Sequence, residues 1–141
     1  MKKRDEFSFF QEFRVRYSEI DSQGVVFNSH YMTYFDSAIT EYIRSLNYSY
    51  VQLVQERGID FHLIKTTTEF HKPVFFDEII EVGVALSKIG NTSLTWSLAI
   101  FKKDNDQCLT SGELIWVCTL LGTNKSYPLP EDLKELLKKK S

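Results

Sequence analysis

The sequence predicts an α+β domain in which a five-stranded antiparallel sheet curls around one long helix. One alternating apolar segment comes first, and a stripe of large apolar residues at helical spacing follows it at 31–46. Further alternating segments, joined by short polar turns, then fill residues 66–121. A long apolar helix followed by a meander of strands buries its apolar side best against the sheet that those strands form.

The first half of the chain contains one predicted strand and two predicted helices. Residues 9–20 alternate, with Phe13, Val15 and Tyr17 on one face, which is typical of a half-buried strand. A turn at 21–24 leads into a long amphipathic helix. Residues 51–57 predict a short second helix that ends at Gly58. The apolar stripe of the long helix comprises Tyr31, Tyr34, Phe35, Ala38, Tyr42, Ile43 and Leu46.

The second half reads as four strands and a terminal helix. Residues 66–70 favour a strand that stops near Pro73, and 77–88 and 94–100 alternate on either side of a turn at 90–92. A polar tip at 103–106 precedes a long strand at 107–121. We expect residues 1–141 to form a single domain, with a flexible tail at 1–8 and a C-terminal helix within 131–141.

Composition narrows the class of protein. A net charge of −2 gives no general attraction to nucleic acid or anionic membranes, and no apolar run has the length of a membrane span or signal peptide. Cys108 and Cys118 fall on one predicted strand, roughly 33 Å apart, too far to form a disulfide with each other. Two unpaired thiols without an export signal predict a cytoplasmic protein. No His or Cys pair has metal-ligand spacing, so we expect no metal site.

Residues 17–36 carry the chemical signal, because an acid and a glycine share a short turn that leads into an aromatic-rich helix. This arrangement aims the Asp21 carboxylate and the free N–H groups of a helix start at one spot. A carbonyl placed there would meet a base or nucleophile on one side and hydrogen-bond donors on the other, as acyl transfer requires. Asp is also favoured in turns, and Asn28 at helix starts, for local hydrogen bonding alone.

The same segment resembles the hotdog-fold acyl-CoA thioesterases of the 4-hydroxybenzoyl-CoA thioesterase type. Their motif here comprises Tyr17, Asp21, Gly24, Val26, Asn28, Tyr31, Tyr34 and Asp36. The similarity spans about residues 10–130, and its later matches are Pro73, Asp77, residues 90–93, Gly112, Leu129 and Pro130. It implies the hotdog fold, a long central helix wrapped by the sheet.

The resemblance also implies a reaction, the hydrolysis of a thioester to a carboxylic acid and CoA. Asp21 stands at the position of the catalytic acid, which attacks the carbonyl or activates a water. The N–H of Asn28 stands at the position of the oxyanion donor, where the helix dipole favours negative charge. The substrate is an acyl-CoA or an acyl-carrier-protein thioester, and no separate cofactor is implied. The predicted substrate-binding residues are Gly24, Val26, Tyr31, Tyr34, Phe35, Asp36 and Lys88.

Association and two alternative functions complete the sequence-based expectations. One sheet covers one side of the long helix, so an exposed outer face and edge strand predict a homodimer or homotetramer. A non-catalytic acyl-CoA or acyl-carrier binding module would use Asp21 only as a turn residue. An enoyl-CoA hydratase of the same fold would place a His a few residues after Asp21, where this chain has Val26.

Overall fold

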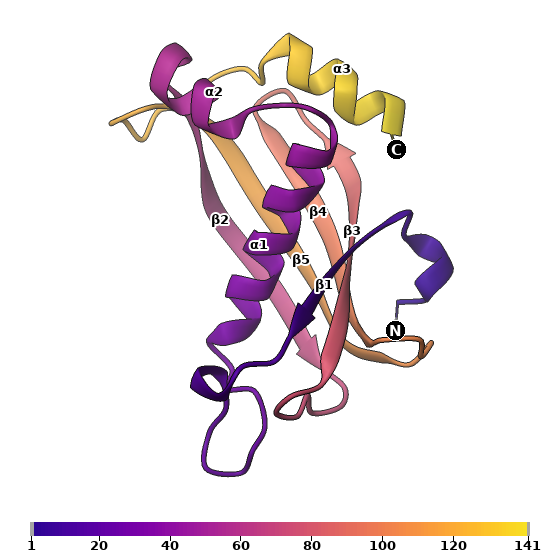
Figure 1. Ribbon diagram of the computed structural model, residues 1–141. Helices are drawn as coiled ribbons and strands as arrows, with labels where there is room; N and C mark the ends of the chain where they lie inside the picture. The colour runs from indigo at the N-terminus through magenta and orange to yellow at the C-terminus, as the bar shows by residue number, and fades with distance from the viewer. Residues whose placement is uncertain (1, 141) are drawn as a thin grey trace.

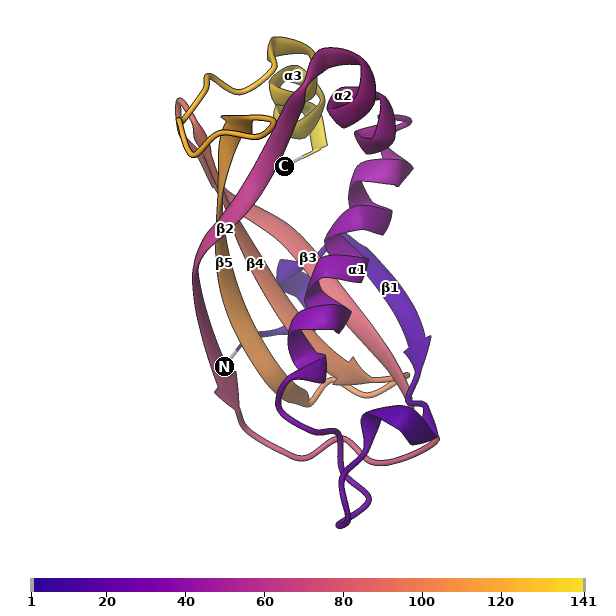
Figure 2. The ribbon, with the colours of Figure 1, turned by 90° about the vertical axis from the view of Figure 1, so that its left-hand side faces the viewer.

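The computed structural model describes residues 2–140 and confirms the predicted architecture. Five antiparallel strands in the order β1-β3-β4-β5-β2 curl around one side of a single long helix (Figures 1 and 2). The strands are β1 Phe9–Arg14, β2 Ile59–Phe70, β3 Ile79–Ile89, β4 Ser93–Lys102 and β5 Cys108–Leu120. The helices are α1 His30–Ser45, α2 Tyr50–Arg57 and α3 Glu131–Lys140, with short 3-10 turns η1 Arg4–Glu6 and η2 Tyr17–Glu19.

The core lies between α1 and the inner face of the sheet. The predicted alternation holds on β4, where Leu94, Trp96, Leu98 and Ile100 are all fully buried. Opposite them, α1 buries the face that carries Phe35. A Cβ added at Gly112 would lie 2.7 Å from Cε2 of Phe35, so β5 admits the helix this closely only because it has a glycine there. The helix therefore has a fixed position against the sheet.

The first strand is shorter, and the second longer, than the alternation predicts. β1 ends at Arg14, and the chain then forms η2, which leaves Tyr17 77% exposed instead of facing inward. A hydrogen bond from the N–H of Glu19 to the carbonyl of Arg16, 2.9 Å long, closes this 3-10 turn. β2 begins at Ile59 because it pairs with β5 along its length, with a register shift between Leu63 and Lys65.

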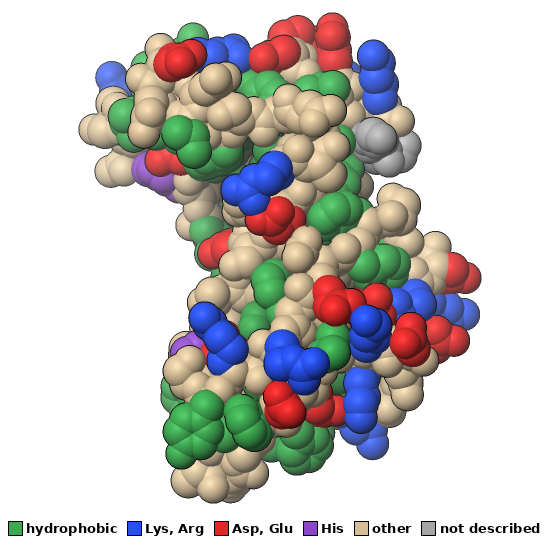
Figure 3. Space-filling view, in the orientation of Figure 1, with side chains coloured by type: hydrophobic (Ala, Val, Ile, Leu, Met, Phe, Trp, Pro, Cys, Tyr) green, Lys and Arg blue, Asp and Glu red, His purple; other side chains and the backbone are tan. Residues whose placement is uncertain are grey.

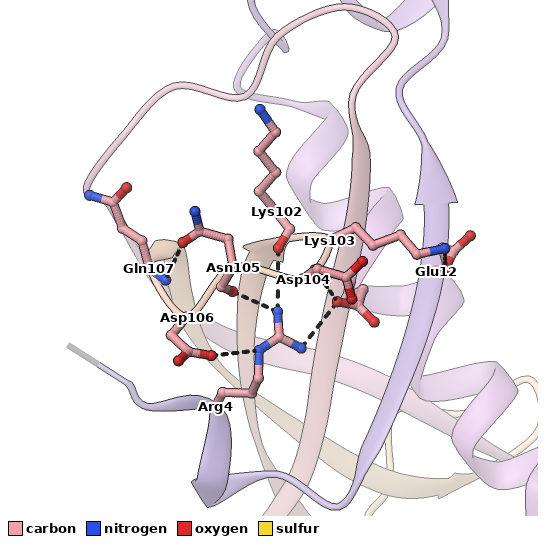
Figure 4. Close-up of polar contacts among 9 residues, drawn as sticks. Arg4, Glu12, Lys102, Lys103, Asp104, Asn105, Asp106 and Gln107 are labelled. Carbon is pink, nitrogen blue, oxygen red and sulfur yellow. Dashed lines mark hydrogen bonds and ion pairs between the residues drawn. The ribbon is translucent and has the colours of Figure 1, made fainter.

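Residues 2–8, for which the sequence predicts a flexible tail, contact the sheet in the structure. Phe7 is buried over Gly83 on the outer face of the sheet. Arg4 pairs with Glu81 at 3.1 Å and with Asp106 at 3.3 Å, and it donates to two carbonyls of the β4–β5 hairpin (Figure 4). The bonds to the two carbonyls join residues about one hundred positions apart, and together with the ion pairs they attach the N-terminal segment to the sheet.

The two short helices close the upper end of the sheet in Figure 1. Leu53 of α2 and Leu133 and Leu137 of α3 are fully buried, and Arg57 pairs with Asp132 at 2.9 Å. Gly58 ends α2 with φ +64°, as predicted. The predicted C-terminal helix corresponds to α3, which extends to residue 140, and Met1 and Ser141 lie outside the described residues. Within residues 2–140, no helix has the length and apolar character needed to cross a membrane.

Candidate active site

The turn after β1 is a narrow hairpin with defined hydrogen bonds. The N–H of Asp21 donates to the carbonyl of Val25 at 2.9 Å, and the N–H of Gly24 donates to the carbonyl of Asp21 at 3.0 Å. Gly24 has φ +77°, a left-handed conformation that residues with a side chain adopt at a cost. The loop between β2 and β3 also holds the hairpin, because the N–H of Phe76 donates to the carbonyl of Gly24 at 3.0 Å. The turn is thus a rigid support for Asp21.

The Asp21 carboxylate has one oxygen engaged and one available. Oδ1 accepts the N–H of Gln23 at 2.8 Å, a local bond typical of an Asp at the start of a turn. Oδ2 has no donor among residues 2–140. The first oxygen fixes the orientation of the side chain. The second can take a proton from water or attack an electrophile.

The start of α1 offers an unoccupied donor beside this turn. The helix begins at His30, and the Ser29 side chain makes no capping bond. The N–H of His30 donates back to Phe27 at 3.0 Å, whereas the N–H of Asn28 has no acceptor in the described part of the chain. A free N–H at the positive end of a 16-residue helix favours a developing negative charge. An N–H of this kind can donate a hydrogen bond to an anionic oxygen.

A pocket of about 280 Å³ opens at the helix start. The Tyr31 ring forms one wall, edge-on to Phe70 at 4.9 Å between ring centroids. Burial raises the pKa of Tyr31, and the nearby negative charge of Asp21 raises it further, so the phenol stays neutral beside the carboxylate. The lining residues are Val25, Val26, Asn28, Tyr31, Phe70, His71, Lys72 and Pro73. The lining is mainly apolar, which suits an acyl group.

The structure brings five of the predicted site residues together at the pocket and the turn beside it. Asn28, Val26 and Tyr31 line the pocket, and Asp21 and Gly24 form the turn beside it. Asp36 lies on the exposed side of α1, and partial burial by its neighbours raises its pKa. Its place on the outer side of the helix leaves it outside the lining of this pocket.

Three other predicted residues lie elsewhere in the chain. Phe35 is fully buried against Gly112, and the Tyr34 hydroxyl points to Glu19, so neither lines the pocket. Lys88 lies at the far end of β3, and the nine residues back to Ile79 span about 30 Å. Ile79 pairs with Arg14 at the end where the turn lies. Within one chain, Lys88 is therefore remote from Asp21.

Glu19 is the residue that sequence reasoning missed. It is a carboxylate only 4% exposed, and it bonds to Arg16, just after β1, and to Tyr34 of α1. The available signal was its position, because the alternation predicted along the sequence puts this acid on the same face as Phe13 and Val15. A carboxylate in such a position needs hydrogen-bonding partners.

The surroundings of the turn are aromatic and exposed. Hydrophobic side chains gather at the lower end of the molecule in Figure 3, over the loops that hold the turn. They include Phe27, Phe75 and Phe76, each about half exposed, and Tyr17, which packs edge-on against Phe76 with 5.8 Å between the ring centroids.

A larger hollow of about 430 Å³ lies at the opposite end of α1, around Arg44 and Tyr48, away from the turn. Among the residues described, no group of three His, Cys, Asp or Glu could hold a metal ion.

Fold, turn and helix start together define a hotdog-fold protein with an acid in a turn beside a helix start. The family described as the thioesterase superfamily matches residues 23–109, and the chain belongs to this family. It is 28% identical over 130 residues to a putative esterase of Aquifex aeolicus, covering 92% of this chain and 98% of the relative.

Two further relatives carry names that state an activity. The acyl-CoA thioester hydrolase YbgC of Escherichia coli O6:H1 is 29% identical over 120 residues, covering 85% of this chain and 88% of the relative. The crystal structure of a DHNA-CoA thioesterase from Staphylococcus aureus superposes with a TM-score of 0.85 at 25% identity. That match covers 92% of this chain and 88% of the other. Family, fold and named relatives agree on thioesterases.

Proposed function

We propose that this protein hydrolyses acyl-CoA thioesters to a carboxylic acid and CoA, with Asp21 as the acting carboxylate. One observation carries the proposal: a carboxylate oxygen of Asp21 and the backbone N–H of Asn28 both lack a hydrogen-bond partner among residues 2–140, and both residues lie beside the same pocket. Membership of the thioesterase superfamily and the names of the relatives support the same reaction. The family includes proteins named for CoA thioesters, so CoA is the proposed carrier.

The proposed chemistry needs two groups of the protein. Oδ2 of Asp21 removes a proton from water, which attacks the thioester carbonyl, or Oδ2 attacks the carbonyl itself and water then cleaves the acyl–enzyme anhydride. In both routes the carbonyl oxygen becomes an oxyanion that accepts the N–H of Asn28. The C–S bond then breaks, and CoA leaves as its thiolate. The apolar walls around Tyr31 and Phe70 hold the acyl group.

The proposed enzyme is a homodimer or homotetramer. β2 is an edge strand of the sheet, and on it Leu63 and Ile64 are 43% and 61% exposed. Pairing two copies along this edge would cover these side chains. Asp36 and Lys88 lie outside the lining of this pocket in one chain, and across such an interface they would reach the substrate of the neighbouring copy. We propose these contacts as partner contributions.

The decisive test is Asp21→Asn, measured on purified protein with a panel of acyl-CoA thioesters and detection of free thiol. The amide keeps the shape and the local bond to Gln23, so folding survives, but it is neither a base nor a nucleophile. We expect kcat to fall at least ~100-fold while KM changes little. The matched control is Asp104→Asn, the same substitution at an exposed hairpin residue with φ +59°, which should keep full activity.

The outcome of this test also decides between functions. If Asp21→Asn hydrolyses its best thioester at close to the wild-type rate, the catalytic role of Asp21 is wrong. If the wild-type protein binds acyl-CoA in a direct binding measurement without hydrolysing any thioester of the panel, the protein is a binding module. Hydration of an enoyl-CoA without thiol release would instead identify a hydratase.

A further inference from the structure

We infer that Glu19, held by Tyr34 and Arg16, is a positioning residue that fixes the catalytic turn relative to the helix start. This inference rests on the proposed thioesterase function. It assigns a role to a buried acid outside the pocket lining, and it gives Tyr34 a role other than contact with the acyl group.

The Glu19 carboxylate bonds to two residues, Tyr34 of α1 and Arg16. Oε1 accepts the hydroxyl of Tyr34 at 2.7 Å and the backbone N–H of Arg16 at 2.8 Å. Oε2 accepts two N–H groups of the Arg16 guanidinium at 3.0 and 3.2 Å. The first bond attaches the carboxylate to α1, and the others attach it to Arg16, which lies between β1 and η2. A carboxylate is suited to this place because it can accept all four hydrogens.

The charges in this cluster support the same arrangement. Burial by itself raises the pKa of Glu19, but hydrogen bonds from the Arg16 backbone, the Tyr34 hydroxyl and the Arg16 guanidinium lower it below its usual value overall. Burial and the adjacent Glu19 carboxylate raise the pKa of Tyr34 far above its usual value. Tyr34 is therefore a neutral donor and Glu19 an ionised acceptor across the neutral pH range.

The backbone of Glu19 links both catalytic groups. Its carbonyl accepts the N–H of Phe27 at 2.9 Å, and Phe27 immediately precedes Asn28. Asp21 follows Glu19 by two positions along the same short segment. Movement of Glu19 thus moves the base and the oxyanion donor relative to each other. Errors of about 1 Å in such a geometry can cost up to ~100-fold in rate.

The test compares the same substitution at two buried tyrosines of α1. Tyr34→Phe removes the donor to Glu19 and keeps the ring that packs against Phe13, whereas Tyr42→Phe removes a hydroxyl two turns further along, where the ring packs against Trp96. We expect Tyr34→Phe to lower kcat about tenfold with KM within about twofold, and Tyr42→Phe to leave both unchanged. Glu19→Gln should lower kcat more, since an amide cannot accept all four hydrogens.

Double variants separate positioning from a structural role. If Tyr34 acts through the Asp21 turn, adding Tyr34→Phe to Asp21→Asn should lower the residual rate by much less than tenfold. An undiminished tenfold loss in that background would overturn the inference, as would equal rates for Tyr34→Phe and Tyr42→Phe. Failure of the proposed function is distinguishable, because it shows as wild-type activity in Asp21→Asn alone.

Discussion

At the scale of single residues, two carboxylates only two positions apart, Glu19 and Asp21, have opposite surroundings. Glu19 is buried and has all its acceptor positions occupied by donors from Arg16 and Tyr34. Asp21 is half-buried and keeps Oδ2 free. A fully bonded acid holds structure, and an acid with a free oxygen beside a pocket can do chemistry. The local environment, and not the residue type, thus assigns the roles.

The lowered pKa of Glu19 predicts how stability depends on pH. The unfolded chain binds a proton at this residue near the usual pKa of 4.5, and the folded protein binds it only at lower pH. Its contribution to stability is therefore complete above about pH 4.5 and is lost as pH falls through the folded pKa. We expect the urea concentration at the unfolding midpoint of the wild-type protein to decrease as the pH is lowered below about 4.5.

Variants of the same cluster check that assignment. Glu19→Gln should show a weaker fall of the urea midpoint below about pH 4.5, because the titrating group is gone. Tyr34→Phe, which removes one donor, should give an intermediate dependence. An unchanged acid dependence in Glu19→Gln would assign the loss to other groups.

At the scale of elements, the close approach of α1 to β5 fixes the helix start against the sheet. The approach depends on the absence of a side chain at Gly112, opposite the fully buried Phe35. Asn28 lies two residues before the helix and Tyr31 lies in its first turn, so the position of the helix on the sheet decides where the proposed oxyanion donor and the pocket wall lie. Packing in the middle of the helix is thereby connected to geometry at its end.

Gly112→Ala tests this packing. The new methyl group would lie 2.7 Å from Cε2 of Phe35, so the ring or the strand must move. We expect a loss of about 1–3 kcal/mol in the free energy of unfolding, measured by urea denaturation. Glu113→Ala, at the exposed neighbouring position of β5, should change stability by less than about 0.5 kcal/mol. Equal effects of the two substitutions would contradict a tight contact at Gly112.

At the scale of the whole molecule, the outer edge of strand β2 has no neighbouring strand within one chain. β2 is long, carries exposed Leu63 and Ile64, and has a register shift at this point against β5. β1 forms the other edge. An exposed apolar edge strand favours pairing with another copy.

Ile64→Lys tests the proposed association. A charge on the exposed edge should prevent burial of that edge, so light scattering at micromolar concentration should show a lower mass than the wild-type assembly. The control is Val51→Lys on α2, because Val51 is also β-branched and also 61% exposed. Wild-type mass for both variants would place the interface elsewhere, and a monomeric wild-type protein would rule out the proposed association.

The sequence by itself determined the elements whose pattern is local. The alternation along β3 and β4, the apolar stripe of α1 and the glycine at the end of α2 are all readable because neighbouring residues carry the signal. The Asp21–Gly24 turn before a helix is equally local, and so the predicted acid and the predicted helix start do lie together.

Only the tertiary structure decided the features that depend on distant partners. Arg4 attaches the N-terminal segment through Glu81 and Asp106, which no local pattern links to it. The ending of β1 at Arg14, the distance of Lys88 from the turn, and the bond between Glu19 and Tyr34 are likewise set by packing between elements. Periodicity records which face of a segment is buried, but the partner that a buried polar group finds is fixed only when the elements come together.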